Sequence, residues 1–223
     1  MKYTPEECEL VDDWLDSCTT DHDYIVISSF TVKTPYQAAA KKLADSMNEF
    51  SIPGRIYSTK SKGLWRDNCF VTNHIILKAL RDYPDKNIVW IDADAYFQAY
   101  PKLFDDYKYD LGMYYRIVPG RYGGHRQCCS GTIFMRNFPP MHRFYEQFIQ
   151  YLEPLDIYAN AQRHFGETLE EDPDIHVDPD FPAEYCTLVV SGGLYIGKSI
   201  ERAVIIQGHA LREFGIIDKG CVV

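Results

Sequence analysis

Short apolar runs and amphipathic segments alternate through the first half of this chain. The runs Tyr24–Ser29, Arg55–Ser58 and Asn87–Ile91 carry β-branched and aromatic side chains, which is typical of buried strands. Between these runs, Tyr36–Phe50 and Trp65–Tyr83 repeat apolar side chains every three or four residues, as the buried face of a helix does. This order of strand, helix, strand, helix and strand predicts an α/β fold with a parallel sheet between helices.

The second half of the chain is less regular. Strands are expected at Asp110–Arg116 and Gly131–Arg136, and the segment between them, Val118–Arg126, is rich in glycine and basic residues. Such a segment is typical either of a mobile loop beside a site or of a plain surface loop. No repeat or linker divides the sequence, so residues 1–223 are expected to form a single domain. The other expected elements are helices at Thr4–Ser17, Pro139–Tyr151 and Tyr158–Glu170, and strands at Ile175–Val177 and Ala203–Ile206.

Composition places the chain among ordinary globular proteins and narrows its partners. Its 223 residues are 46% hydrophobic and 25% charged, and the net charge of −9 argues against broad binding to nucleic acid. The seven cysteines have no regular spacing, which favours reduced thiols in a cytosol-like compartment. The sequence shows neither a signal-like segment nor an apolar run long enough to span a membrane. We therefore expect a cytoplasmic protein without a membrane anchor.

Two aspartates, Asp92 and Asp94, directly follow the apolar run Asn87–Ile91. Carboxylate oxygens are the ligands that Mg²⁺ and Mn²⁺ prefer, and ligands of α/β proteins bind at the carboxyl ends of the strands. The pattern therefore indicates a site for a hard divalent cation. The alternative is a solvated turn that happens to be acidic.

Five segments of the chain carry a resemblance to a known family. In order, they are Thr31–Met47, Trp65–Asn68, Asn87–Ala95, Cys129–Asn137 and Ala203–His209. Together they resemble the GT-A type of nucleotide-sugar-dependent glycosyltransferases. The resemblance implies a single-domain GT-A (Rossmann-like) fold with a central, mainly parallel sheet flanked by helices. It also implies metal-dependent transfer of a sugar from a nucleotide-diphosphate sugar, with a UDP-sugar as the expected donor. One departure is Phe70–His74, which lacks the lysine that many relatives carry on this helix.

The resemblance assigns metal-binding roles to three residues. Asp94 is expected to bind Mn²⁺ or Mg²⁺ directly, while Asp92 binds the ion more loosely or contacts the ribose. His209, after the strand at Ala203–Ile206, is the candidate third ligand. Histidine at a strand end is also common in ordinary structural positions.

Further residues are candidates to bind the donor. Thr31 and Tyr36 lie where the family binds the base, although Tyr36 also fits the apolar stripe of its helix. Lys62 and Arg66 are candidates for the phosphates, with a solvated basic pair as the alternative. Small side chains at Ser130 and Gly131 would leave room for the sugar, or they serve tight strand packing. Arg121, His125 and Arg126 are candidates to close over the diphosphate, or they belong to a solvated loop.

Glu167 is the candidate acid or base, and Asp94 is the other candidate catalytic residue. The segment Gly166–Leu169 resembles the acidic helix start that faces the acceptor in many relatives, and Asp110 is a second candidate near the sugar. An inverting enzyme needs such a carboxylate to take the acceptor proton, whereas a retaining enzyme does not. Retention is slightly favoured, because the metal site completed by histidine resembles that of retaining members.

Two other classes of protein remain open. A nucleotidyltransferase has a related α/β fold, but it usually carries a Gly-rich basic loop where this chain has Ser28–Thr31. A non-catalytic sugar- or nucleotide-binding relative would have no need of the intact Asp92, Asp94 and His209.

The expected acceptor is soluble and is a glycan, a protein, a metabolite or a modified nucleobase. A viral or bacterial source fits so compact an enzyme.

Overall fold

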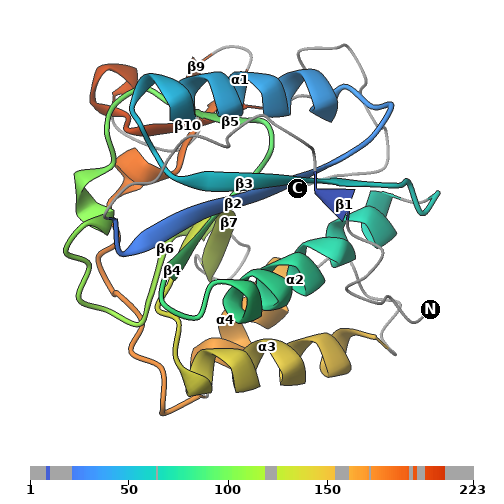
Figure 1. Cartoon of the computed structure of the whole chain (residues 1–223). Coiled ribbons are helices and arrows are strands. Elements are labelled where there is room, and N and C mark those ends of the chain that lie inside the picture. Colours follow the sequence, from blue (N-terminus) through green and yellow to red (C-terminus); the bar gives the residue numbers. More distant parts are fainter. Residues whose placement is uncertain are drawn as a thin grey trace.

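The computed structural model describes residues 9–10, 22–63, 65–118, 125–153, 161–170, 172–190, 193–194 and 199–208 of the 223-residue chain. Within these ranges, six strands form the main sheet in the order β1-β3-β2-β4-β7-β6 (Figure 1). Neighbouring strands β3, β2 and β4 are parallel, as the first half of the sequence predicts. The strands are β1 (Glu9–Leu10), β2 (Tyr24–Thr31), β3 (Gly54–Thr59), β4 (Asn87–Ile91), β6 (Leu111–Val118) and β7 (His125–Met135).

The sheet is mixed rather than mainly parallel. Strand β7 pairs antiparallel with both β4 and β6, and β1 pairs antiparallel with β3. Strands joined by a short hairpin run antiparallel, whereas parallel neighbours need a long crossover. In the described part of the main sheet, helices of the first half of the chain supply that crossover, and β3, β2 and β4 are the strands that run parallel.

Helices cover one face of the main sheet, and one helix with a second sheet covers the other (Figure 1). Alternate residues of β4 point to opposite faces: Ile88 and Trp90 join the core beneath α2, α3 and α4, and Val89 and Ile91 join the core beside α1. A strand buried on both faces explains the continuous apolar run. The helices are α1 (Tyr36–Glu49), α2 (Trp65–Asp82), α3 (Pro139–Leu152) and α4 (Ala161–Glu170).

A second, smaller sheet lies beside α1 (Figure 1). In the described part of the chain its order is β5-β10-β8-β9. Strand β5 follows the two aspartates directly and pairs antiparallel with β10. The sequence pattern did not predict β5, β8 or β9, because a run of two to four residues has no measurable period. The strands are β5 (Ala95–Phe97), β8 (Thr187–Val190), β9 (Gly193–Leu194) and β10 (Ile205–Gln207).

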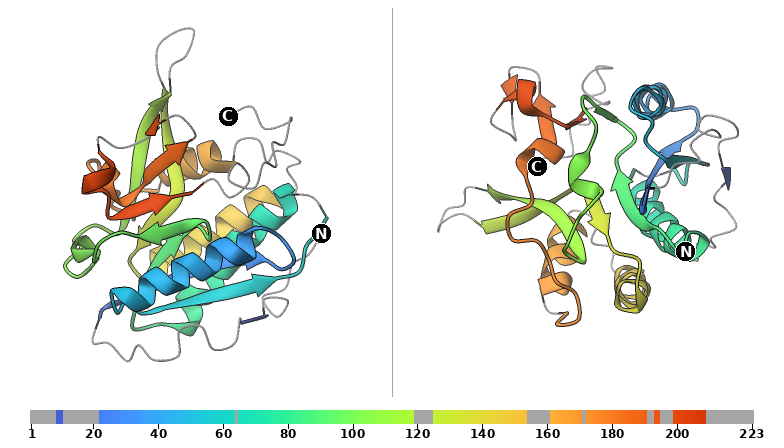
Figure 2. Two further views of the ribbon diagram at one scale, coloured as in Figure 1. Left: turned by 90° about the horizontal axis from the view of Figure 1, so that it is seen from above. Right: turned by 60° about the vertical axis from the view of Figure 1, so that its left-hand side comes forward.

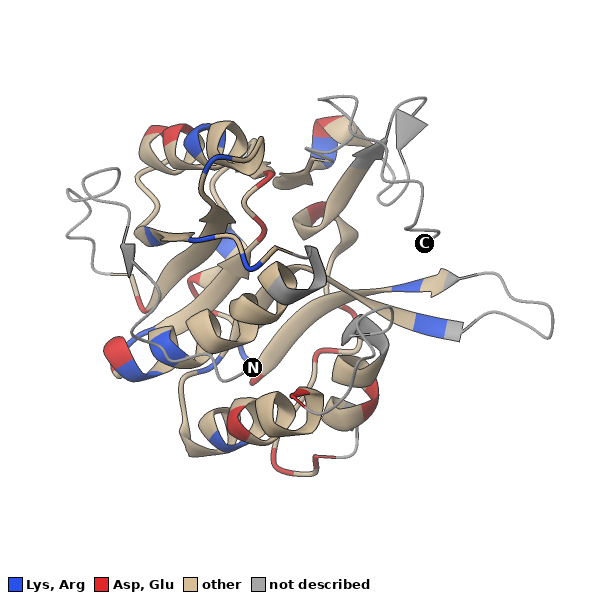
Figure 3. Cartoon of the chain, turned by 90° about the vertical axis from the view of Figure 1, so that its right-hand side faces the viewer, with Lys and Arg blue, Asp and Glu red and all other residues tan. Residues whose placement is uncertain are grey.

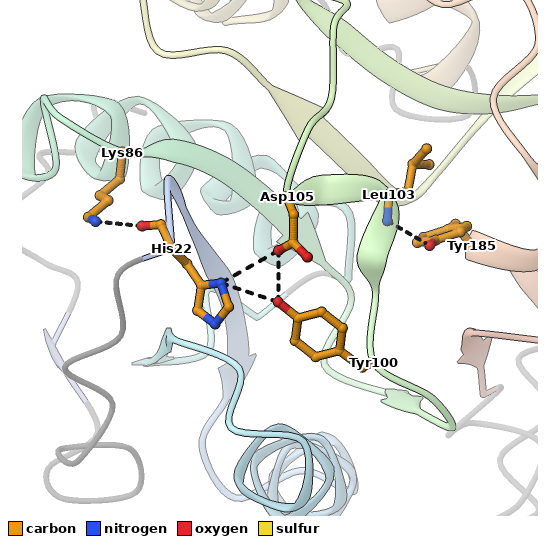
Figure 4. Close-up of polar contacts among 6 residues, drawn as sticks. All are labelled: His22, Lys86, Tyr100, Leu103, Asp105 and Tyr185. Carbon is orange, nitrogen blue, oxygen red and sulfur yellow. Dashed lines mark hydrogen bonds and ion pairs between the residues drawn. The ribbon is translucent and has the colours of Figure 1, made fainter.

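Polar contacts hold the connection after β5 against the amino edge of the main sheet (Figure 4). The Tyr100 hydroxyl donates to Asp105 at 2.7 Å and lies 3.2 Å from Nδ1 of His22, just before β2. Lys86, just before β4, donates to the carbonyl of His22. These contacts lie at the end of β2 and β4 that is opposite to Asp92, so they fix the second sheet without occupying the candidate site.

Three expected elements differ from the structure. The helix expected at Thr4–Ser17 is wrong at Glu9–Leu10, which pair as a strand with Tyr57 and Ser58; the rest of that segment lies outside the described residues. The loop expected at Val118–Arg126 is shorter, because Val118 ends β6 and His125 begins β7. The strand expected at Ile175–Val177 is an isolated bridge between Val177 and Leu111.

Three further features complete the description of the fold. Strands β6 and β7 extend together away from the body of the protein (Figures 2 and 3). None of the described helices is long and apolar enough to cross a membrane. None of the cysteines of the described residues, Cys69, Cys128, Cys129 and Cys186, forms a disulfide.

Candidate functional site

The two aspartates lie where β4 ends. The Asp92 N–H donates to the carbonyl of Gly131 in β7 at 2.9 Å, and the Ala95 N–H donates to the Asp92 carbonyl at 3.0 Å. The chain therefore leaves the sheet at Asp92, turns, and enters β5 at Ala95. Ala93, between the aspartates, is buried in the core, whereas Asp92 and Asp94 are half-buried. The strand followed by two acidic side chains is thus confirmed.

The electrostatics of this turn favour a bound cation. Burial and the negative charge of Asp94 raise the pKa of Asp92 to about 7, although the Trp90 indole N–H, which donates to Asp92 Oδ1 at 3.0 Å, acts against that rise. Two carboxylates that repel one another are stabilised when a cation lies between them. The oxygen donors of Asp92 and Asp94 therefore fit Mg²⁺ or Mn²⁺. Within the described residues, no group of three or more His, Cys, Asp or Glu side chains is arranged to hold a metal.

Strand β10 brings the segment before His209 to Asp94. Gln207 pairs with Ala95, and the Gly208 N–H donates to the Asp94 carbonyl at 2.8 Å. A Cβ atom on Gly208 would lie 2.4 Å from that carbonyl oxygen, so this close approach requires glycine. His209 itself lies outside the described residues, and its role as third ligand stays a prediction.

Ser130 and Gly131 lie in a bulge of β7 beside Asp92. Met113 of β6 pairs with Ile133 and the next residue, Tyr114, pairs with Cys129, so the residues between Cys129 and Ile133 bulge out of the ladder. A Cβ atom on Gly131 would lie 2.8 Å from Cδ of Gln207. Glycine at position 131 therefore makes room for the Gln207 side chain. This agrees with the alternative that the small residues serve tight strand packing. An approach of the donor sugar to Ser130 and Gly131 stays a prediction.

The candidate donor-binding residues lie at the same edge of the sheet as Asp92. Thr31 ends β2 and Lys62 follows β3; β2 lies between β3 and β4 and is parallel to both. The Lys62 N–H donates to Asn68 Oδ1 at 2.9 Å, which ties this loop to α2. Tyr36 is half-buried against the core beside α1, so its core role is observed. The side chain of Arg66 lies outside the described residues, although its backbone belongs to α2.

Glu167 does not lie at a helix start. It is the seventh residue of α4, its side chain is exposed, and Oε2 lies 3.6 Å from Nδ1 of His164. The preceding Gly166 faces Cys128 and Tyr115, because α4 packs on β6 and β7 over the core shared with α2 and α3. The expectation that Gly166–Leu169 is a helix start is therefore wrong.

Asp110 is remote from the turn at Asp92. It precedes Leu111, which pairs with Met135, and Met135 pairs with Ile88 at the start of β4. Asp110 therefore lies at the edge of the sheet opposite to Asp92. Its carboxylate is buried, forms an ion pair with Arg136 at 2.9 Å and accepts the His176 N–H at 3.0 Å. The second acid or base candidate is thus a structural residue.

Two further residues of the site were not singled out from the sequence. Trp90 was assigned only to the buried strand, yet its indole N–H reaches Asp92. In the sequence analysis, Gln207 belonged only to the segment Ala203–His209 that carries the resemblance, yet its buried amide contacts β7. The signal that could have identified Gln207 is its amide, which ends the otherwise apolar run Ala203–Gln207.

Comparisons with known proteins support the fold. No family model matches the chain, and no curated protein sequence matches it. Among solved structures, the chain is similar to a glycosyltransferase involved in the glycosylation of the major capsid of PBCV-1, with 15% sequence identity and a TM-score of 0.53. The match covers 82% of this chain and 92% of that one. The predicted α/β fold, with a central sheet flanked by helices, is therefore confirmed, and it is similar to the fold of a solved glycosyltransferase.

Weaker likenesses extend to two longer glycosyltransferases. The bifunctional enzyme WbbM has a TM-score of 0.49 at 10% identity, over 85% of this chain and 46% of its own. GlyE of Streptococcus pneumoniae TIGR4 has a TM-score of 0.42 at 12% identity, over 74% of this chain and 48% of its own. This chain thus spans about half the length of these two proteins.

Proposed function

We propose that this protein is a metal-dependent glycosyltransferase that moves a sugar from a nucleotide-diphosphate sugar, with a UDP-sugar as the expected donor. One observation carries the proposal: in a glycosyltransferase fold, Asp92 and Asp94 lie together at the end of β4, and the segment before His209 is hydrogen-bonded to Asp94. The proposed acceptor is a soluble glycan, protein, metabolite or modified nucleobase.

Asp94, Asp92 and His209 are the proposed ligands of Mn²⁺ or Mg²⁺. The bound cation would neutralise the negative charge that develops on the departing diphosphate. Trp90 holds the Asp92 carboxylate through its indole N–H, and Gly208 holds the backbone of Asp94. These contacts fix the carboxylate of Asp92 and the backbone of Asp94 before the donor arrives.

The residues proposed to bind the donor belong to the edge of the sheet at which Asp92 lies. Thr31 and Tyr36 are proposed to contact the nucleoside, and Lys62 and Arg66 the phosphates. Ser130 and Gly131, in the bulge of β7, are proposed to lie beside the sugar. Retention of the anomeric configuration is favoured, because Glu167 is exposed within α4 and a retaining reaction does not need it as a base.

The proposal is tested by incubating the protein with a panel of nucleotide-sugars and Mn²⁺ and measuring nucleotide release. The wild type is expected to release UDP, and EDTA to abolish the release. Asp94→Asn should lower the rate by roughly 10²–10³, the usual loss when a charge-stabilising group is removed. Asp45→Asn is the matched control, since Asp45 is exposed on α1 and pairs with Lys41.

Two results would overturn the proposal. An Asp94→Asn variant with full metal-dependent activity would exclude the aspartates as the metal site. Release of pyrophosphate from nucleoside triphosphates, without release of UDP from any nucleotide-sugar, would favour the nucleotidyltransferase alternative.

A further inference from the structure

Gln207 is a buried polar residue that joins the two sheets. It lies in β10 of the smaller sheet and is 4% exposed. Its side-chain Nε2 donates to Oγ1 of Thr132, a fully buried residue of β7 in the main sheet, at 2.7 Å. A hydrogen bond of good length between two buried side chains holds β10 and β7 in one relative position.

The chain is shaped around this amide. Gly131 has no side chain, and a Cβ atom there would lie 2.8 Å from Cδ of Gln207. Among the described residues, Oε1 of Gln207 has no hydrogen-bond partner. A buried acceptor without a donor costs free energy, whereas an apolar side chain of similar length would fill the space without that cost. Stability alone therefore does not account for glutamine at this position.

The bridge closes a ring of contacts around the two aspartates. Asp92 donates its N–H to the carbonyl of Gly131, the residue before Thr132. Gly208, the residue after Gln207, donates its N–H to the carbonyl of Asp94. The backbone of each aspartate is thus tied to one of the two strands that the side chain of Gln207 connects.

We propose that Gln207 is a positioning residue of the candidate metal site, because its bond to Thr132 fixes the peptide that precedes His209 relative to Asp92 and Asp94. This inference rests on the proposed function. Residues that orient metal ligands without touching the metal typically change metal affinity by 10–100-fold when they are replaced. A residue that served packing alone would change the thermal stability and leave metal affinity unaltered.

The test measures Mn²⁺ affinity by calorimetry, with and without UDP, together with the melting temperature. Gln207→Met keeps the length of the side chain and removes the hydrogen bond, so it should weaken Mn²⁺ binding at least tenfold while the melting temperature stays the same or rises. Ile205→Val is the control, because it loosens the same strand at a fully buried position without touching the bridge. It should lower the melting temperature and leave Mn²⁺ affinity unchanged.

A second variant breaks the same bond from the other side. Thr132→Val removes the hydroxyl with little change of shape and should weaken Mn²⁺ binding to a similar extent. In the double variant the two losses should not add, because both remove one interaction. Thr132→Val also tests the inference if Gln207→Met does not fold.

The outcomes separate this inference from the proposed function. If the wild type binds Mn²⁺ and both single variants bind it equally well, Gln207 is a packing residue and the positioning role is wrong, while the metal site stands. If the wild type itself does not bind Mn²⁺ with or without UDP, the proposed metal site and the positioning role both fail.

Discussion

Asp92 and Asp94 are held in different ways, although both follow the same strand. The carboxylate of Asp92 accepts a side-chain hydrogen bond from Trp90, whereas Asp94 is held at its backbone by Gly208. Trp90 of β4, Gly131 of β7 and Gly208, just after β10, thus hold the two half-buried aspartates in place.

Buried histidines make stability depend on pH. Burial lowers the pKa of His74, and burial together with the positive charge of Arg81 lowers the pKa of His142, both from 6.5. The unfolded chain therefore binds protons more readily than the folded protein below about pH 6.5, so stability is lost as the pH falls through that value. Protonation of Asp92, whose pKa is raised in the folded protein, acts in the opposite direction. We therefore expect the melting temperature of Asp92→Asn, which lacks this carboxyl, to fall between pH 7.5 and pH 5.5.

His142→Gln isolates one part of this effect. His142 Nε2 lies 2.7 Å from Asn137 Oδ1, and a glutamine amide is able to donate to the same oxygen. The variant should lose less stability than the wild type on acidification, as measured by thermal unfolding at both pH values. Parallel pH profiles for the two proteins would show that His142 does not contribute.

Local periodicity predicts long elements and fails for short ones. The sequence placed β2, β3, β4, α1 and α2 within two residues of their observed ends, because each carries its own apolar pattern. The helix expected at Thr4–Ser17 is wrong at Glu9–Leu10, since pairing with β3 makes these two residues a strand. The sequence pattern does not show the tertiary pairing of β5 with β10. It therefore predicted the two aspartates but not the ring of contacts through Gln207.

The turn from β10 toward Asp94 tolerates no side chain at Gly208. Gly208→Ala forces a Cβ atom against a backbone oxygen that cannot move aside, so we expect a loss of about 1–3 kcal/mol of stability and weaker Mn²⁺ binding. Gly166, inside α4, is the opposite case. A Cβ atom added there would lie 3.8 Å from its nearest neighbours, on Cys128 and Tyr115, so Gly166→Ala should raise the stability by about 0.5–1 kcal/mol. Urea denaturation of both variants measures the contrast, and equal effects would refute it.

The place of Glu167 within α4 bears on the stereochemistry. An exposed carboxylate on a helix that packs over the core shared with α2 and α3 is poorly placed as an essential base. We expect the product to keep the anomeric configuration of the donor, and Glu167→Gln to change turnover by less than about tenfold. Nuclear magnetic resonance of the product gives the configuration. Inversion, with a loss of roughly two to four orders of magnitude in the variant, would restore Glu167 as the base.

The two sheets of the whole molecule meet at the candidate site. The main sheet supplies Asp92 through β4 and the bulge through β7, and the smaller sheet supplies Gly208 after β10. The polar contacts of His22, Tyr100 and Asp105 fix the connection after β5 at the opposite edge (Figure 4). A ligand that binds between the two sheets therefore stabilises both of them.

Global unfolding reports on this coupling. A ligand that binds only the folded state adds about 2.7 kcal/mol at a concentration of 100 times its dissociation constant, and each kcal/mol raises the melting temperature of a chain of this size by about 2–4 °C. Mn²⁺ and UDP together should therefore raise the melting temperature by roughly 5–10 °C. If residues 1–223 form one domain, a single transition shifts as a whole. Calorimetry of the wild type, with Asp94→Asn as the control that should not shift, measures this. Two transitions, only one of which moves, would contradict the single domain, and an equal shift in Asp94→Asn would contradict the metal site.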